Sequence, residues 1–402
     1  MTCLSGKRIL LGITGSIAAY KSAFLTRELV KAGAYVRVIM THGARDFITP
    51  LTLATLSRNP VLSDLIEDRE SGVWTNHVDL ALWADAMIIA PVSAHSLGKM
   101  VTGQSDNLLL LTFLSAKCPV FFAPSMDLDM FKHGSTRENI EKMQSFGHIL
   151  IPVGKGELAS GLEGEGRMAE PEEIIQQVHN YFEARLPLRG KKVLVTAGPT
   201  FERIDPVRFI GNFSSGKMGY AIAEELAQRG AEVTLVSGPT SLKTKHERIQ
   251  TIHVESARDM LEACQREFAA VNWVIMSAAV ADYRPAEQSD QKIKKTDAQP
   301  TVHLALNPDI LKWMGQHKAP NQILVGFALE TNNAVENARK KLKAKNLDLI
   351  MLNSLEDDQS GFGYDTNKVT LITADNKTLP LELKTKTEVA RDLIDYLQQS
   401  AQ

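Results

Sequence analysis

The stretch FIGNFSSGKMGYAIAEELAQRGAEV, residues 209–233, carries the pattern that decides the fold. A loop rich in glycine and serine leads into a helical pattern that ends at Gly230, and the alternating, valine-rich strand pattern AEVTLVSG follows it. Upstream, KKVLVTAG at residues 191–198 has the composition of a buried strand. A strand, a loop, a helix and a second strand in this order predict a parallel α/β sheet.

The loop that opens this helix matches neither standard phosphate-binding motif. Gly216-Lys217 is followed by Met218, whereas a P-loop has a serine or threonine there to contact nucleotide-bound magnesium. The spacing of Gly211, Gly216 and Gly219 is also not that of a dinucleotide-binding fingerprint. The loop by itself therefore leaves open which phosphate it holds.

The same order of elements occurs near the N-terminus. KRILLGIT (residues 7–14) is a strand pattern, GSIAAYKSAFLTRELVKAG (15–33) is a helical pattern, and AYVRVIMT (34–41) is a second strand pattern. Further short apolar strands alternate with amphipathic helices in both halves, as in parallel sheets that are covered on both faces. We therefore predict an α/β fold of two Rossmann-like three-layer domains with mostly parallel sheets, whose ligands lie at the carboxyl ends of the strands.

Composition limits the class of protein. A chain of 402 residues is too long for one ordinary core, and the basic stretch at 184–192 divides it into predicted domains 1–190 and 191–402.

The 45 basic and 47 acidic residues nearly balance, so overall charge favours neither nucleic acid nor a membrane as partner. An odd number of cysteines without metal-ligand spacing predicts free thiols and no metal site. With no signal-peptide or membrane-span pattern, we expect a cytoplasmic protein.

Three features of the first half are candidates for a site, and each also has a structural explanation. Gly15 and Ser16 at a helix start would favour an anion, although a tight turn needs a glycine as well. His77 precedes an apolar helix and is either a base facing a pocket or a packed residue. Within residues 153–171, a stretch of thirteen residues (154–166) holds five glycines and three glutamates, which is typical of a flexible loop or of a lid over an active site.

In the second half, three polar groups are candidates for a site, and the first of them, at Asp282, follows a clear strand pattern. Asp282 is placed to contact a substrate or a metal–nucleotide, or else it caps a helix or belongs to a turn. The basic run QKIKK is interpreted as a solvated strand face unless one lysine reaches a phosphate. Lys341 and Lys345 lie one helical turn apart with no acid between them to pair them, so we expect mutual repulsion that an anion would relieve. Together the clusters favour a polyphosphate site.

Taken together, these motifs resemble a family of bifunctional coenzyme A biosynthesis enzymes, in which phosphopantothenoylcysteine decarboxylase is fused to phosphopantothenate–cysteine ligase. The resemblance covers essentially the whole chain. It is most specific in the second half, where the following motifs occur in the family's order: TAGPTFERIDPVRFIGNFSSGKMG, GAEVTLVSGP, AAVADYRP, KIKK, NPDI, VGFALET and KNLDLI.

For the second domain, the resemblance implies that CTP activates the carboxylate of 4′-phosphopantothenate and that the amine of cysteine attacks the acyl-cytidylate. Lys292 would stabilise the developing charge, with magnesium and further lysines neutralising the phosphates. Arg208, Asn212 and the loop at 214–217 would hold the acyl substrate and its phosphate. The implied nucleotide-binding residues are Ser277, Ala278, Asp282, Lys292, Pro308, Asp309, Ile310, Leu311, Phe327, Lys341 and Lys345.

The first domain resembles the flavin-containing cysteine decarboxylases. The resemblance implies that FMN lies at Gly15 and Ser16 with further contacts near Ser93, and that His77 acts in the chemistry. FMN would oxidise the thiol end of the substrate, which eases loss of carbon dioxide, and the product would then be reduced and protonated. The likeness also implies trimers, often assembled into dodecamers, with FMN at subunit contacts, and dimers of the ligase half.

Two positions depart from the pattern of this family. The family commonly reads Pro-Ala-Met-Asn where this chain has Pro124-Ser125-Met126-Asp127, and an aspartate would repel the substrate carboxylate that the asparagine contacts. Ser160 replaces a cysteine that supplies the final proton, and a hydroxyl is a weaker acid. Asp127, Glu157 and Glu163 are candidates for a replacement acid.

These departures leave an alternative in which the ligase works and the flavin domain is a structural or regulatory module. Neutralising Asp127 or a glutamate of the lid would abolish decarboxylation in a rescued enzyme and change nothing in a module. A nicotinamide dehydrogenase is disfavoured, because neither half has G-x-G-x-x-G with a matching acidic residue.

Overall fold

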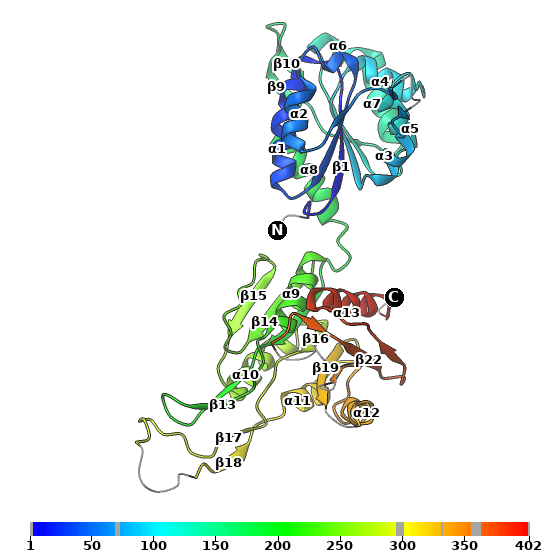
Figure 1. Cartoon of the computed structure of the whole chain (residues 1–402). Helices are drawn as coiled ribbons and strands as arrows, with labels where there is room; N and C mark the ends of the chain where they lie inside the picture. The colour runs from blue at the N-terminus through cyan, green and yellow to red at the C-terminus, as the bar shows by residue number, and fades with distance from the viewer. Residues whose placement is uncertain (1–2, 69–72, 295–300, 331–332, 355–362, 401–402) are drawn as a thin grey trace. The chain divides into compact units, whose positions relative to one another are not determined.

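The computed structural model describes residues 3–68, 73–294, 301–330, 333–354 and 363–400. The chain forms two compact units, Met1–Arg185 and Leu186–Gln402, and each has its own sheet and hydrophobic cores (Figure 1). The break between the units falls inside the basic stretch at 184–192.

A six-stranded parallel sheet forms the centre of the first unit, in the order β3-β2-β1-β6-β7-β8. Its strands are β1 (Arg8–Ile13), β2 (Tyr35–Met40), β3 (Val61–Leu62), β6 (Ala86–Val92), β7 (Val120–Pro124) and β8 (Ile149–Leu150). Every residue of β6 is buried, which is why the central strands read as continuous apolar runs. The predicted α/β fold with a mostly parallel sheet is confirmed for this half.

Helices cover both faces of this sheet (Figure 1). One core lies under α1 (Lys21–Lys31), α2 (Pro50–Ser57) and α8 (Pro171–Glu183). The other lies under α3 (His77–Trp83), α4 (Ala94–Val101), α5 (Leu108–Ser115) and α7 (Gly134–Ser145). Smaller elements are η1 (Ile17–Tyr20), η2 (His42–Ala44), β4 (Ile66–Asp68), β5 (Val73–Trp74) and α6 (Leu128–Lys132). The hairpin β9 (Gly154–Glu157) and β10 (Glu163–Arg167) is formed by the glycine-rich segment that was a candidate lid.

The second unit has an eight-stranded sheet in the order β15-β14-β11-β16-β19-β20-β22-β23. Its strands are β11 (Lys192–Ala197), β14 (Glu232–Ser237), β15 (Ile249–His253), β16 (Trp273–Met276), β19 (Ile323–Glu330), β20 (Leu349–Ser354), β22 (Val369–Thr373) and β23 (Thr378–Pro380). The pairs from β15 to β20 are parallel, and β22 and β23 add an antiparallel edge. The mostly parallel sheet predicted for this half is therefore also confirmed.

Two helices cover one face of this sheet and three cover the other. One core lies under α9 (Lys217–Gln228) and α13 (Lys386–Ser400). The opposite core lies under α10 (Ala257–Phe268), α11 (Ile310–His317) and α12 (Ala334–Ala344). A short antiparallel pair, β21 (Thr366–Asn367) and β24 (Lys384–Thr385), precedes α13. The stretch 209–233 forms helix α9 and the start of β14, and β11 is formed by the upstream strand pattern KKVLVTAG.

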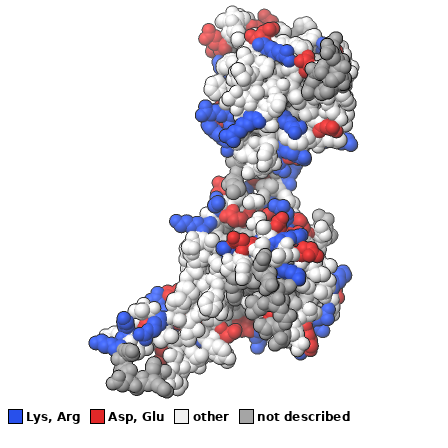
Figure 2. Space-filling view, viewed as in Figure 1, with Lys and Arg blue, Asp and Glu red and all other residues white. Residues whose placement is uncertain are grey.

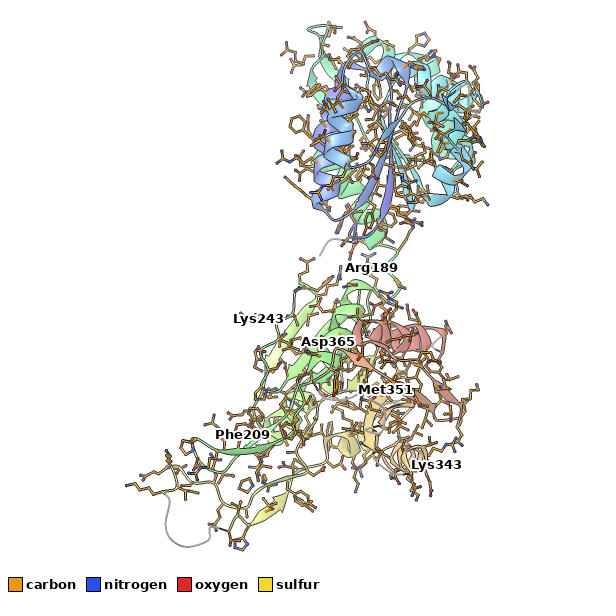
Figure 3. All side chains as sticks on the ribbon, in the orientation of Figure 1. Arg189, Phe209, Lys243, Lys343, Met351 and Asp365 are labelled. Atoms are coloured by element: carbon orange, nitrogen blue, oxygen red, sulfur yellow. The ribbon has the colours of Figure 1, made fainter. Side chains whose placement is uncertain are left out.

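Two antiparallel ribbons form an arm that extends from this second sheet. They are β12 (Phe201–Arg203) with β13 (Phe209–Gly211), and β17 (Tyr283–Pro285) with β18 (Leu304–Leu306). Figure 3 labels Phe209 on the arm and Met351 in the sheet, and Figure 2 shows basic side chains gathered on the arm. The run QKIKK was interpreted as a strand face, and this is wrong: residues 291–294 are exposed and lie outside every strand, and Lys295 lies outside the described residues.

No helix within the described residues is long and apolar enough to span a membrane.

Candidate functional sites

Each unit has a large cavity at the carboxyl edge of its sheet. The cavity of the first unit has a volume of about 700 Å³, and that of the second about 890 Å³. Both volumes are in the range of small-molecule and cofactor sites. In parallel sheets, ligands bind at this edge because the loops that leave the strands meet there.

The walls of the first cavity are the loops that follow β1, β6 and β7. Ser16 caps η1 and lies with its Oγ 3.0 Å from Oγ of Ser125. Ser93 caps α4 by accepting a hydrogen bond of 3.3 Å from the amide of Ser96. A Cβ atom at Gly15 would lie 2.9 Å from the carbonyl oxygen of Gly43, so only glycine fits where this loop passes its neighbour. The predicted residues Gly15, Ser16, Ser93, Met126 and Asp127 all line this cavity.

The β9–β10 hairpin forms a flap whose base is held to two of these loops. The amide of Met126 donates to the carbonyl of Gly166 at 3.1 Å. Lys21, whose exposed fraction is 6%, donates from Nζ to the carbonyl of Met168 at 3.1 Å and to Glu170 at 2.7 Å. A buried ammonium group must be paired in this way. Residues 157–159 of the flap consequently face the cavity.

Two predicted residues of this half lie apart from the cavity. Ser160 follows the cavity-lining part of the flap and is itself exposed. His77 is the first residue of α3, with its ring 6.2 Å from that of Trp74 and its Nδ1 buried without a hydrogen-bond partner. None of the described residues that line the cavity belongs to α3. A single chain therefore does not bring His77 and Ser160 together with Asp127.

The second cavity gathers nearly all the predicted nucleotide-binding residues. Of the eleven residues in that set, all but Lys292 line it. They come from the loop after β16, the start of α11, the end of β19 and the last turn of α12. The loop that precedes α9, from Ser214 to Gly216, lines the same cavity. Residues far apart in the sequence thus meet around one space.

The charges in this cavity are paired, which qualifies one expectation. Lys345 forms an ion pair with Asp309, and Lys341 donates from Nζ to the carbonyl oxygen of Phe327 at 2.8 Å. The expected repulsion is present, since, after burial, the charge of Lys345 helps to lower the pKa of Lys341, but partners from other elements already offset part of it. Burial lowers the pKa of Lys341, and Glu330 only partly opposes this. Despite burial, the bond to Lys345 helps to hold the pKa of Asp309 below its usual value.

The remaining predicted residues of this half lie on or beside the arm. Arg208 and Lys292 are exposed, and neither is among the described residues that line the cavity. Asn212 donates from Nδ2 to the carbonyl of Ala279 at 3.0 Å, and Ala279 is part of the cavity wall. The base of the arm is therefore joined directly to the wall.

Sequence reasoning missed several residues that line the two cavities. In the second, Lys386 has an exposed fraction of 8% and donates to the carbonyl of Tyr364 at 2.5 Å. Burial and the nearby Lys217 lower the pKa of Lys386. Asn353, from the end of β20, and Asn367 also line this cavity. In the first cavity, Lys21 was missed, since a lysine in a helical pattern looks like a solvated residue. The buried position of these side chains gave no signal in the sequence.

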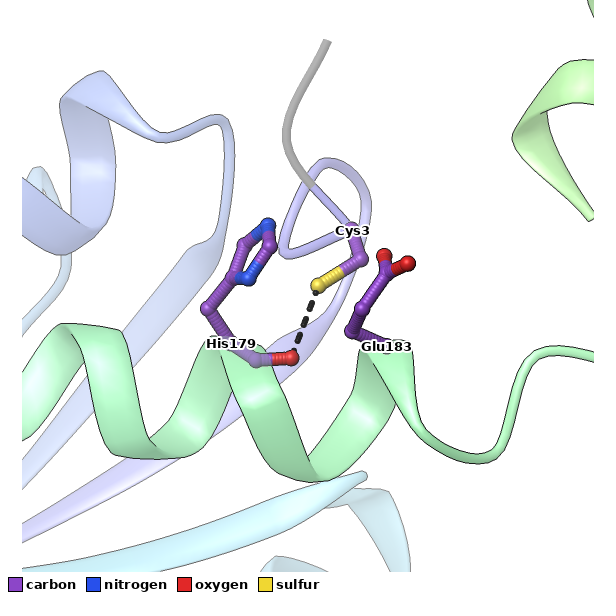
Figure 4. A group of neighbouring side chains, drawn as sticks. All are labelled: Cys3, His179 and Glu183. Atoms are coloured by element: carbon purple, nitrogen blue, oxygen red, sulfur yellow. Dashed lines mark hydrogen bonds between the residues drawn. The ribbon is translucent and has the colours of Figure 1, made fainter. Parts of the chain in front are cut away.

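A separate group of metal-type donors lies in the first unit, where Cys3, His179 and Glu183 have donor atoms within 4.8 Å of one another (Figure 4). The thiol of Cys3 donates to the carbonyl oxygen of His179 at 3.2 Å. Burial, followed by the charge of Glu183, raises the pKa of this thiol to about 11. The hydrogen bond from this thiol joins the N-terminal segment to α8.

We expect Gly166→Ala to release the base of the flap. Gly166 has φ +136°, and a Cβ atom there would lie 2.4 Å from the carbonyl oxygen of Met126, so β10 must move away. Trypsin should then cleave the flap at Lys155 or Arg167 faster than in the parent protein. Gly161→Ala at the flap turn is the control, because its φ is also positive but its Cβ atom would meet nothing within 4 Å. Equal cleavage of the two variants would contradict this account of the flap.

We expect binding of pyrophosphate to the second cavity to weaken as pH rises toward 10. Because the pKa of Lys341 is lowered from 10.5, this lysine loses its positive charge at a lower pH than an ordinary lysine does. Lys341→Arg keeps its charge throughout this range, so its affinity should decline less in isothermal titration. Lys343→Arg, at an exposed position of the same helix that is not among the described residues lining the cavity, should follow the parent protein. A parallel decline in all three proteins would show that Lys341 does not contact the anion.

The family models that match this chain correspond to its two halves. A model described as Flavoprotein matches residues 1–183. A model described as DNA/pantothenate metabolism flavoprotein C-terminal domain matches residues 188–400.

Curated relatives match nearly the whole chain. A Bacillus subtilis (strain 168) protein named coenzyme A biosynthesis bifunctional protein CoaBC is 44% identical over 98% of this chain and 97% of its own length. A protein of an unknown prokaryotic organism, named cysteine/cysteine sulfinic acid decarboxylase, is 52% identical over 86% of this chain and 98% of its own length. The crystal structure of the C-terminal domain of a CoaBC protein is 45% identical, with a TM-score of 0.46, and covers 54% of this chain and 97% of that chain.

Proposed function

This chain belongs to the family of bifunctional coenzyme A biosynthesis proteins, enzymes with decarboxylase and ligase roles, and we propose that it makes 4′-phosphopantetheine in two steps. The unit Leu186–Gln402 would condense 4′-phosphopantothenate with cysteine, using CTP and passing through an acyl-cytidylate. The unit Met1–Arg185 would then remove carbon dioxide from the cysteine moiety with the help of FMN.

The observation that carries this proposal is the convergence of the predicted nucleotide residues on the second cavity. Its lysines would neutralise a triphosphate, whose charge must be screened before a carboxylate can attack it. Magnesium keeps most of its ligands from water and substrate phosphates, and exposed Asp282 offers it one carboxylate at the cavity wall. Phe327 supplies an apolar surface for the base.

The loop before α9 is proposed to hold phosphates of the nucleotide, and not the phosphate of the acyl substrate as the resemblance suggested. Gly216 caps α9 in the left-handed conformation, and the first amides of a helix are available to an anion. This loop shares its cavity with the proposed nucleotide residues. The acyl substrate would then lie toward the arm, where Arg208 and Lys292 can meet its charged groups.

The first cavity fits FMN by its volume and by its donors. Two helix starts, capped by Ser16 and Ser93, line it, and such amides suit the phosphate group. When bound, FMN would take electrons from the thiol end of the substrate and return them after carbon dioxide has left. The flap would exclude water during this chemistry.

Proton delivery in the first unit is assigned to Asp127 and Glu157. Asp127 is half-buried in the cavity wall, and Glu157 lies on the cavity-lining part of the flap. Ser160 does not line the cavity. The serine that stands here in place of the family's cysteine therefore takes no proton donor away from the cavity of this chain. His77 would come from a neighbouring copy, since Trp74 and Val78 beside it are 52% and 41% exposed.

A single reaction tests both halves. Purified protein is mixed with 4′-phosphopantothenate, cysteine, CTP and magnesium, and the products are identified by mass spectrometry. We expect a product that has lost carbon dioxide. Accumulation of phosphopantothenoylcysteine would restrict the function to ligation, and no condensation would overturn the ligase proposal.

Free cysteine or its sulfinic acid is a second candidate substrate of the first unit. The observation that favours it is the 52% identity to a protein named for these two substrates. The same protein, incubated with either amino acid and no nucleotide, would release carbon dioxide if this candidate is correct. Turnover only after condensation would exclude it.

We expect Asp127→Asn to slow decarboxylation of phosphopantothenoylcysteine by about a hundredfold or more, which is the usual contribution of a general acid. Ligation should be unchanged, because Asp127 belongs to the other unit. Asp129→Asn, at an exposed position two residues further on, is the matched control and should behave as the parent does. An equally active Asp127→Asn variant would show that another group supplies the proton.

A further inference from the structure

Asp205 is a carboxylate without solvent exposure in a part of the chain that is otherwise exposed. It lies in the turn between β12 and β13 of the arm, and its side chain has an exposed fraction of 0%. The neighbours Val207 and Arg208 are exposed. A charged group is buried at such a place only when several donors surround it.

The two oxygens of this carboxylate have different partners. Oδ1 accepts hydrogen bonds of 2.8 Å from the amides of Val207 and Arg208, and this closes the turn of the hairpin. Oδ2 accepts a hydrogen bond of 3.2 Å from the amide of Ile293 and lies 3.4 Å from the guanidinium of Arg208. One oxygen therefore serves the local turn, and the other reaches a segment more than eighty residues away.

Further hydrogen bonds join the same two segments. The guanidinium of Arg208 donates from Nη2 to the carbonyl oxygen of Ile293 at 3.2 Å. The amide of Ser289 donates to the carbonyl of Ile204 at 2.9 Å. Asp205, Arg208 and Ile293 consequently form a closed ring of hydrogen bonds. Lys292, the residue before Ile293, lies in an exposed stretch without a strand or helix, so its backbone is held by this ring together with the bond from Ser289 to Ile204.

We propose that Asp205 is a positioning residue of the ligase reaction, whose buried carboxylate holds Lys292 and Arg208 in one geometry toward the acyl substrate. The inference rests on the proposed function, since it takes Lys292 as the residue that stabilises charge at the activated carboxylate. Asp205 itself contacts neither substrate nor nucleotide. Without its Oδ2, the segment that carries Lys292 keeps only the bonds from Arg208 and Ser289.

Asp205→Asn is the sharpest test, because it removes only the second set of contacts. The amide oxygen of asparagine still closes the turn, and asparagine is favoured there. The amide nitrogen would face the N–H of Ile293 as a second donor and could not bind it. We expect the turnover number of condensation to fall by about a hundredfold, as a displacement of about 1 Å can cause.

The pattern of kinetic constants separates positioning from general damage. The KM for 4′-phosphopantothenate should rise with the loss of Arg208 geometry, whereas the KM for CTP should stay unchanged. The hydrogen-bond partners of the Asp205 carboxylate, Val207, Arg208 and Ile293, are not among the described residues that line the nucleotide cavity. Asp290→Asn removes the same charge at an exposed position of the same segment and should leave all three constants as in the parent.

A double-mutant cycle completes the test. In a Lys292→Gln background, Asp205→Asn should cause little further fall in the turnover number, because it acts on turnover through that lysine, whereas the KM for 4′-phosphopantothenate should still rise through Arg208. Losses of turnover number that multiply, or a KM for CTP that rises together with the other constants, would overturn the inference in favour of a structural role. If Lys292→Gln is itself fully active, the proposed role of Lys292 fails, and the single Asp205→Asn variant still reports whether the arm matters for the acyl substrate.

Discussion

Parallel strands impose the constraint on which both sites depend. A strand that runs parallel to its neighbour must be joined to it by a crossover, so the loops that leave successive strands all emerge at the same edge. Helices on both faces then bury the sheet and leave that edge as the place where backbone amides and polar side chains are accessible. Each unit of this chain has its large cavity there. The six parallel strands of the two sheets follow the same order, and the second sheet adds an antiparallel edge.

Buried charged groups fix the movable parts around each cavity. In the first unit, Lys21 binds the segment that follows the flap, and Gly166 allows the flap to pass close to the loop at Met126. In the second unit, Asp205 joins the two segments of the arm that carry Arg208 and Lys292. Because an unpaired charge would be costly when buried, such groups hold each segment in one arrangement. A buried charged side chain thus fixes the position of the exposed loop that it binds.

The two units differ in how many of their proposed site residues a single chain brings to the cavity. The second cavity gathers the proposed nucleotide residues from four parts of its unit. The first cavity holds the loops suited to a flavin, whereas His77 lies on α3 beside exposed apolar side chains and away from the cavity wall. This difference explains why a site assembled across copies is proposed for the decarboxylase and not for nucleotide binding.

The sequence by itself determined the two α/β units, their mostly parallel sheets and the loops in which ligands lie, because buried strands, helix periods and terminal glycines are local patterns of the chain. It also singled out by resemblance most of the residues that line the second cavity. Only the tertiary structure decided that Lys345 pairs with Asp309, that Lys21 and Lys386 are buried, and that Asp205 joins two distant segments. These facts depend on which side chains meet after the chain has folded, and electrostatic pairing between distant segments leaves no periodic signal in the sequence.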